Sequence, residues 1–261
     1  MYNFEFEKPT TVADAVAALG GDDAQALGGG QTLIPTLKQR LNQPGKLVSL
    51  TGISEMNGVS VDGGVVTVGA ATCHADVEAG AGAYPALAAL AGQIGDPAVR
   101  NRGTVGGSLA NNDPAACYPS AALGSGATIV TNTREIAADD YFQGMFSTAL
   151  EEGEIITAVK FPIPDCASYQ KFLQPASRFA LTGVFVAKYG DNVRVAVTGA
   201  SEEGVFRWAE AEAALSANFA PEAIDGLSVS ADGMVGDIHG TPAYRAHLVG
   251  VMTKRAVAAA H

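Results

Sequence analysis

The sequence has few cysteines and no long apolar run. Its three cysteines, Cys73, Cys117 and Cys166, lie 44 and 49 residues apart, without the close spacing of iron–sulfur or zinc sites, so we expect no metal site in this chain. No apolar segment approaches the roughly 20 residues that span a bilayer. Residues 1–6 also lack the basic and apolar parts of a secretory signal. We therefore expect a cytoplasmic protein without a membrane span.

Basic residues are scarce as well. Sixteen Lys and Arg stand against 27 Asp and Glu, which gives a formal net charge of −11. A field of this sign repels nucleic acid and anionic membrane surfaces. Nucleic acid is therefore not an expected partner, and any ligand that carries phosphate must be held by local groups.

Several familiar motifs are missing. The chain has neither a Gly-Lys-Ser/Thr phosphate loop nor the Gly-x-Gly-x-x-Gly of a Rossmann unit. We find no spacing that supports a nucleophile with its base, or a pair of catalytic carboxylates. No catalytic residue is therefore predicted, and the candidate chemistry is that of ligand binding.

The length and a hydrophobic content of 48% suit two modest domains with sizeable cores. Pro162-Ile163-Pro164 marks the predicted boundary. Residues 1–163 form the first domain, with lobes at about 1–56 and 57–163, and residues 164–261 form the second. Strands are expected at 3–7, 24–27, 59–69 (a hairpin), 127–131, 155–161 and 184–198 (a second hairpin), and helices at 11–19, around Pro35, after a Thr72 cap, and at 85–93, 208–215 and 241–259.

Two stretches rich in glycine could bind a polar ligand. In Gly28-Gly29-Gly30-Gln31-Thr32, several backbone N–H groups can converge on one anion such as a pyrophosphate, although an ordinary tight turn explains this segment equally well. Residues 95–125 are dominated by small residues and are expected to be a long functional loop. Within it, Thr104 and Ser108 offer hydroxyls and Asn111, Asn112 and Asp113 offer acceptors, while the alternative is again a plain connection.

These segments resemble the medium, FAD-binding subunit of the carbon monoxide dehydrogenase and xanthine dehydrogenase family of molybdenum hydroxylases. The resemblance covers nearly the whole chain. It rests on Gly28 to Thr32, Gly95 to Arg102, Thr104 to Ser108, Asn111 to Ala116, and Tyr244-Arg245-Ala246-His247-Leu248.

The resemblance implies an α+β fold, in which a two-lobed FAD-binding domain of the vanillyl-alcohol-oxidase (PCMH) type precedes a small α+β C-terminal domain. It also implies which residues hold FAD, with the aromatic ring of Phe179 stacking near the isoalloxazine. The full candidate set is Leu27, Gly28, Gly29, Gly30, Gln31, Thr32, Leu33, His74, Ile94, Thr104, Gly106, Gly107, Ser108, Asn111, Asp113, Ala116, Cys117, Ile156, Lys171 and Phe179.

Two of these positions carry alternatives. The family frequently has an aspartate at the position of Cys117, and a cysteine is a poorer hydrogen-bond acceptor, so a structural thiol is the competing interpretation there. His74 is equally well explained as a structural histidine.

The function that the resemblance implies is electron transfer. A molybdenum cofactor in a large subunit would oxidise the substrate, two two-iron two-sulfur clusters in a small subunit would relay the electrons, and FAD in this chain would pass them to an external acceptor. The alternatives are a flavin oxidoreductase that acts on its own and a non-catalytic assembly subunit that has lost FAD.

Overall fold

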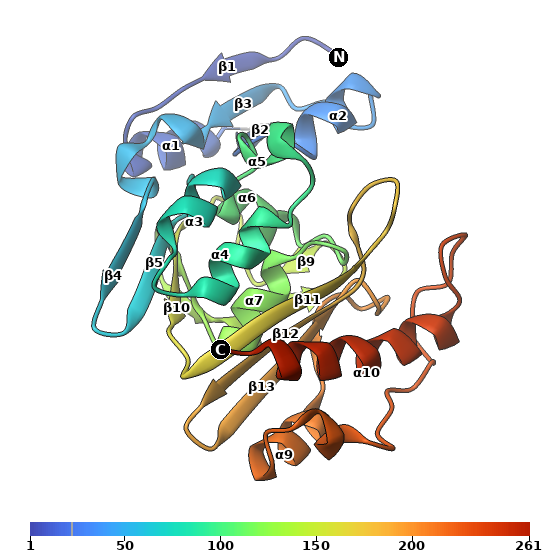
Figure 1. Cartoon of the computed structure of the whole chain (residues 1–261). Coiled ribbons are helices and arrows are strands. Elements are labelled where there is room, and N and C mark those ends of the chain that lie inside the picture. Colours follow the sequence, from blue (N-terminus) through green and yellow to red (C-terminus); the bar gives the residue numbers. More distant parts are fainter. Residues whose placement is uncertain (22) are drawn as a thin grey trace.

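Three main sheets organise the chain in a computed structural model that describes residues 1–21 and 23–261 (Figure 1). The N-terminal sheet is parallel, with the strand order β1-β3-β2. Its strands are β1 (Glu5–Glu7), β2 (Ala24–Leu27) and β3 (Lys46–Ser49), and its helices are α1 (Val12–Leu19) and α2 (Leu33–Lys38). Helix α1 confirms the helix expected at 11–19, and Thr11 caps it, because its hydroxyl accepts a hydrogen bond of 3.1 Å from the Asp14 N–H.

The second sheet is antiparallel, with the order β4-β5-β10-β6-β7. Its strands are β4 (Val59–Asp62), β5 (Val65–Gly69), β6 (Thr128–Thr131), β7 (Glu135–Ala137) and β10 (Ile156–Pro162). The predicted hairpin at 59–69 is confirmed. Its turn uses Gly63 and Gly64 at φ of 55° and 80°, a conformation that glycine adopts without steric cost.

The third sheet, β11-β12-β13-β14, is antiparallel and covered on both faces. Its strands are β11 (Cys166–Leu173), β12 (Ala180–Tyr189), β13 (Asn192–Thr198) and β14 (Phe206–Arg207). Along β12, Val184 and Val186 join the core beneath α9 (Ala209–Ala217) and α10 (Pro242–Ala259), while Phe185 joins the core of the N-terminal half. This sheet therefore attaches the C-terminal helices to the rest of the molecule.

Residues 95–125 are not the long loop that we predicted. Three helices lie there: α5 (Pro97–Arg100), α6 (Val105–Asn111) and α7 (Tyr118–Ser125). Every residue of α7 is buried, and a helix that is buried all round has no amphipathic period for sequence reading to detect. The caps could have revealed α5 and α6, since the side chains of Asp96 and Thr104 accept from Val99 N and Gly107 N.

Two smaller predictions also need correction. Thr72 does not cap a helix: its hydroxyl accepts from Gly58 N at 2.8 Å, and α3 (His74–Gly80) begins one residue later, after Cys73. The strand β11 was not expected. The elements that complete the fold are α4 (Pro85–Gly92), α8 (Ala138–Tyr141), β8 (Phe142–Gly144), β9 (Ser147–Thr148) and the 3-10 turns Leu50–Gly52, Ser54–Met56 and Pro221–Ile224.

The long C-terminal helix agrees with its prediction. Thr241 accepts from Tyr244 N at 3.2 Å and Pro242 occupies the first helical position, as is typical of helix starts. Over the part of the chain that the structure describes, no helix is both long enough and apolar enough to cross a membrane.

Candidate cofactor site

A cavity of about 530 Å³ lies between the loop after β2, helix α6, and the tip of the β11–β12 hairpin. All twenty candidate residues line it, from Leu27 to Phe179. The fold thus brings together segments more than 150 positions apart in the sequence. The individual contacts that these residues make with a cofactor remain predictions.

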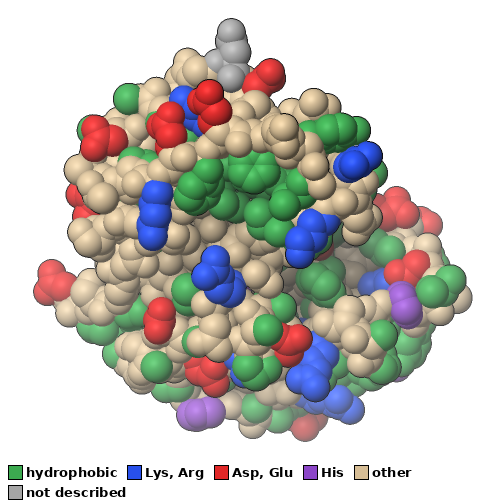
Figure 2. Space-filling view, turned by 90° about the horizontal axis from the view of Figure 1, so that it is seen from above, with side chains coloured by type: hydrophobic (Ala, Val, Ile, Leu, Met, Phe, Trp, Pro, Cys, Tyr) green, Lys and Arg blue, Asp and Glu red, His purple; other side chains and the backbone are tan. Residues whose placement is uncertain are grey.

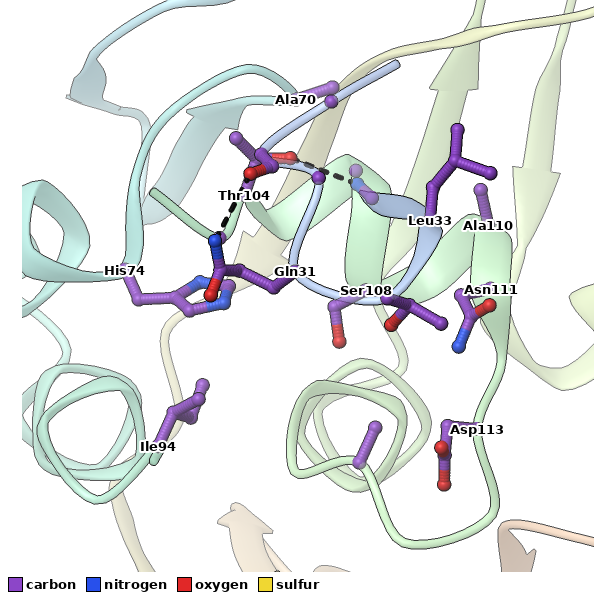
Figure 3. Close-up of a pocket in the computed structure, with 18 of the residues that line it drawn as sticks. Gln31, Leu33, Ala70, His74, Ile94, Thr104, Ser108, Ala110, Asn111 and Asp113 are labelled. Carbon is purple, nitrogen blue, oxygen red and sulfur yellow. Dashed lines mark hydrogen bonds between the residues drawn. The ribbon is translucent and has the colours of Figure 1, made fainter. Parts of the chain in front are cut away.

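The loop after β2 presents free backbone donors to this cavity. The N–H groups of Gly29 to Thr32 donate to no acceptor among residues 1–21 and 23–261. The loop is held by its other groups, because Ile34 N donates to Gly30 O at 3.0 Å and Gln31 Nε2 donates to Gly29 O at 3.3 Å (Figure 3). Neighbouring unpaired N–H groups are suited to an anionic ligand such as a pyrophosphate.

The two glycine segments pack directly on each other. A Cβ on Gly29 would lie 1.9 Å from the Arg102 carbonyl oxygen, and one on Gly28 would lie 2.9 Å from Thr104 Oγ1. These two glycines are therefore required for contact between the loops. The contact fixes the free N–H groups relative to α6.

Helix α6 contributes polar side chains to the same wall. Thr104 Oγ1 accepts from Gly107 N at 3.2 Å, so its acceptor capacity serves partly as a helix cap. The side chains of Ser108 and Asn111 have no hydrogen-bond partner within the described chain, and both line the cavity. The neighbouring Asn112 points elsewhere and donates to the carbonyls of Gly144 and Ser147 at 2.8 Å each.

The labelled side chains define an extended site (Figure 3). His74 and Ile94 lie on one side, Asn111 and Asp113 lie on the other, and the loop that carries Gln31 and Leu33 lies above them. His74 is only 5% exposed and its Nδ1 has no partner among the described atoms. Burial, with a smaller effect of Arg100, lowers the pKa of His74 to about 4, so the imidazole is neutral at pH 7.

Cys117 and Lys171 form one of the contacts between the two halves of the chain. The Lys171 ammonium donates to Gln93 O at 2.6 Å, to Arg178 O at 3.0 Å and to Cys117 Sγ at 3.5 Å. It therefore ties the end of α4 to the β11–β12 hairpin tip. Phe179 at that tip is 51% exposed, and its free ring surface is available for stacking.

Sequence reasoning missed other parts of the wall. Gln25, Ala70, Ala71, Glu154 and Arg178 also line the cavity. Hydrogen bonds from Arg134 first, and then from Thr131 and Thr133, lower the pKa of Glu154 to about 2 in spite of its burial. Glu154 belongs to no motif, and the sequence could have indicated it only by its position directly before the predicted strand at 155–161.

The two arginines of the segment Gly95 to Arg102, Arg100 and Arg102, do not line this cavity. Arg100 instead donates to Ile94 O at 3.2 Å and pairs with Glu78 at 3.4 Å.

The face seen from above carries several Lys and Arg side chains along the border of a hydrophobic patch (Figure 2), so the negative net charge is unevenly spread. Across residues 1–21 and 23–261, no group of three or more His, Cys, Asp and Glu is placed to hold a metal ion.

Comparison with known proteins gives the family. Residues 2–164 match the FAD-binding domain in molybdopterin dehydrogenase. The carbon monoxide dehydrogenase medium chain of Hydrogenophaga pseudoflava is 32% identical, over 98% of this chain and 96% of that protein. The nicotine 6-hydroxylase medium subunit of Paenarthrobacter nicotinovorans is also 32% identical, over 97% and 95%. The structure of reconstituted CO dehydrogenase from Oligotropha carboxidovorans superimposes with a TM-score of 0.88 at 30% identity, covering 98% of this chain and 97% of that one.

Fold and site together define a flavin-binding protein of the oxidoreductase class. More particularly, the chain belongs to the FAD-binding subunits of the molybdenum hydroxylase family. The predicted fold class and the predicted FAD cofactor are thereby confirmed. The cavity itself fits FAD, because free N–H groups suit the pyrophosphate and the unpaired polar groups of Ser108 and Asn111 suit hydroxyls of the ligand.

Proposed function

We propose that this chain is the electron-transfer subunit of a molybdenum hydroxylase complex. It receives electrons from iron–sulfur clusters in a small partner subunit, while substrate is oxidised at the molybdenum cofactor of a large partner subunit. It then passes the electrons to an external acceptor. The observation that carries the proposal is one continuous cavity lined by both glycine segments and by the hairpin tip, in a chain with similarity to medium subunits over almost its full length.

The work of this chain is to bind, orient and shield the cofactor. FAD supplies the redox chemistry when bound. Gly29 to Thr32 hold the pyrophosphate with backbone N–H groups, and Ser108 and Asn111 hold hydroxyl groups. Neutral His74 and apolar Ile94 restrict water at one end, and Phe179 covers the site from the hairpin tip. Lys171 keeps that tip in place through Gln93 O and Arg178 O.

We also propose that residues 1–163 are the FAD-binding domain, with lobes at about 1–56 and 57–163, and that residues 164–261 are a second domain. The separate sheets support this division, since β10 ends at Pro162 and β11 starts a new sheet at Cys166. The cavity uses both parts, because Lys171 and Phe179 belong to the second. Expression of residues 1–163 alone tests the division: we expect a folded fragment with weakened FAD binding, and an unfolded fragment would contradict it.

Purification of the tagged chain from its own cells tests the electron-transfer role. We expect FAD, iron, acid-labile sulfide and molybdenum in fixed ratios, with two further subunits. Anaerobic reduction of the iron–sulfur subunit should bleach the flavin absorption of this chain. A chain that purifies alone with FAD and oxidises a small substrate by itself would instead support an independent flavin oxidoreductase. A chain that assembles with partners but binds no FAD would support a non-catalytic assembly subunit.

A further inference from the structure

A thiol and an amine meet in the wall of the cofactor cavity. Lys171 Nζ lies 3.5 Å from Cys117 Sγ, and both residues line the cavity. Cys117 directly precedes α7 and Lys171 lies on β11, so the contact joins positions 54 residues apart. Cys117 is 6% exposed, and the cavity gives a solute as small as hydrogen peroxide a route to the pair.

The amine is held beside the sulfur. Lys171 Nζ also donates to Gln93 O at 2.6 Å and to Arg178 O at 3.0 Å, so it does not point into solvent as the ammonium of an exposed lysine does. Two single bonds through one oxygen atom span slightly less than the distance between Nζ and Sγ. A small movement of the flexible lysine side chain is therefore enough to let one oxygen atom bridge the two groups.

A buried hydroxyl beside the pair lacks an acceptor. Tyr169 is 3% exposed, and its OH has no hydrogen-bond partner among the atoms that the structure describes. Tyr169 and Lys171 are two positions apart on β11 and so lie on the same face of the strand. Burial, followed by the neighbouring Cys117, raises the pKa of Tyr169, so the hydroxyl keeps its proton. An oxygen atom between Sγ and Nζ would be a better acceptor for this proton than sulfur is.

We propose that Cys117 and Lys171 are an oxidation site, at which hydrogen peroxide joins them through a covalent nitrogen–oxygen–sulfur bridge. One peroxide oxidises the thiol to a sulfenic acid. A second oxidises the amine, after the ammonium has released a proton to solvent, to a hydroxylamine. Each group loses two electrons and gains one oxygen, and the other oxygen of each peroxide leaves as water. The hydroxylamine oxygen then bonds to sulfur, the S–OH bond breaks, and a further water leaves.

The bridge changes the wall of the cavity. It links the residue before α7 covalently to β11, and it leaves the Lys171 nitrogen with a single N–H. This nitrogen can then no longer donate to both Gln93 O and Arg178 O. Thiol reductants return sulfur of this oxidation level to the thiol, so the link is reversible. The site needs neither partner subunits nor electron transfer, and it therefore goes beyond the proposed function.

Peptide mass spectrometry on the full chain tests the assignment. The chain, with and without bound FAD, is treated with hydrogen peroxide, alkylated without reductant and digested with trypsin. We expect residues 103–134 joined to residues 161–178, at the summed mass of both peptides plus one oxygen and minus two hydrogens. Dithiothreitol should separate them. A disulfide between Cys117 and Cys166, which lie in the same two peptides, would lack the added oxygen.

Three variants locate the bridge. Lys171→Arg keeps the charge but has no amine to oxidise in this way, and Cys117→Ser has no thiol, so both should abolish the cross-link. Cys166→Ser should retain it. The wild-type chain also holds an internal control, because Lys188 is the strand partner of Cys166 but places its ammonium over the Phe219 ring. We expect no bridge between Cys166 and Lys188.

Three results would overturn the assignment. The first is the absence of the oxygen-containing cross-link from the wild-type chain both with and without FAD. The second is its persistence in Lys171→Arg. The third is an equal yield of a bridge between Cys166 and Lys188, which would show that oxidation is unselective. If Cys117→Ser fails to fold, the wild-type chain, Lys171→Arg and Cys166→Ser still decide the question.

Discussion

Substitution of Gly29 by alanine tests the contact between the two glycine segments. The new Cβ would lie 1.9 Å from the Arg102 carbonyl oxygen and 2.6 Å from Gly103 Cα. Both neighbours are backbone atoms. They are also fixed, because Gly103 N donates to Val99 O at 2.7 Å and Gly103 O accepts from His74 N at 3.0 Å.

The magnitude follows from the distance that the loops must move. Ordinary contact begins at about 3.4 Å, so the segments must separate by about 1.5 Å at this point. Overpacking of a tight contact costs about 1–3 kcal/mol, and the absence of a flexible side chain on either side puts Gly29→Ala at the upper end. Displacement of the N–H groups of Gly29 to Thr32 should raise the Kd for FAD at least tenfold, or about 1.4 kcal/mol.

The assay combines urea unfolding with a titration of the apoprotein by FAD, followed by flavin fluorescence. Gly82→Ala is the matched control, since a Cβ there meets no described atom within 4 Å and its φ is ordinary, and its stability should change by less than about 0.5 kcal/mol. If Gly29→Ala matched this control in both stability and FAD affinity, the packing argument would be refuted.

Three further substitutions test the surroundings of the cavity. The pKa of His74 is lowered to about 4 in the folded chain, so the unfolded chain binds more protons below pH 6.5. The contribution of His74 to stability is therefore complete above pH 6.5 and falls by up to about 3 kcal/mol towards pH 4. His74→Gln should flatten this part of a plot of urea midpoint against pH, and an unchanged slope would contradict the argument. Lys171→Met leaves the carbonyls of Gln93 and Arg178 without their donor and should lower the free energy of unfolding in urea by about 1–2 kcal/mol. The control is Lys254→Met, which removes an exposed ion pair with Asp225 and should cost less than about 1 kcal/mol. Equal losses in the two variants would count against the bridging role of Lys171. Cys117→Asp places a carboxylate beside the Lys171 ammonium and should raise the free energy of unfolding by about 1 kcal/mol; a lower melting temperature would show that desolvation of the carboxylate dominates.

Local signals in the sequence predicted the regular parts of the fold. Gly63-Gly64 and Gly190 mark turns between β-branched runs, and both hairpins lie where they were expected. Thr241-Pro242 likewise marks the start of α10. Such features depend on a few neighbouring residues, so a sequence pattern is sufficient to find them.

Features that depend on burial or on distant contacts were not predictable in this way. Helix α7 has small residues on every face, because the core surrounds it, and its composition indicated a loop. The requirement for glycine at position 29 is created by Arg102, which is 73 positions away. Local composition cannot report such a contact.

The residues of the candidate site were likewise predictable only in part from the sequence. The glycine segments alone were compatible with ordinary turns, and only their resemblance to a known family selected the residues that line the cavity. Glu154 and Arg178, which have no motif of their own, were missed. The contacts of Arg245 were also not predictable from local sequence, since it meets Leu181 and Gly199 only in the folded chain.

The absorption spectrum of the purified chain, with the released cofactor identified by mass, tests the central claim most directly. Our account predicts the bands of oxidised flavin and one FAD released per chain on denaturation. A folded, colourless chain that takes up no added FAD would contradict it.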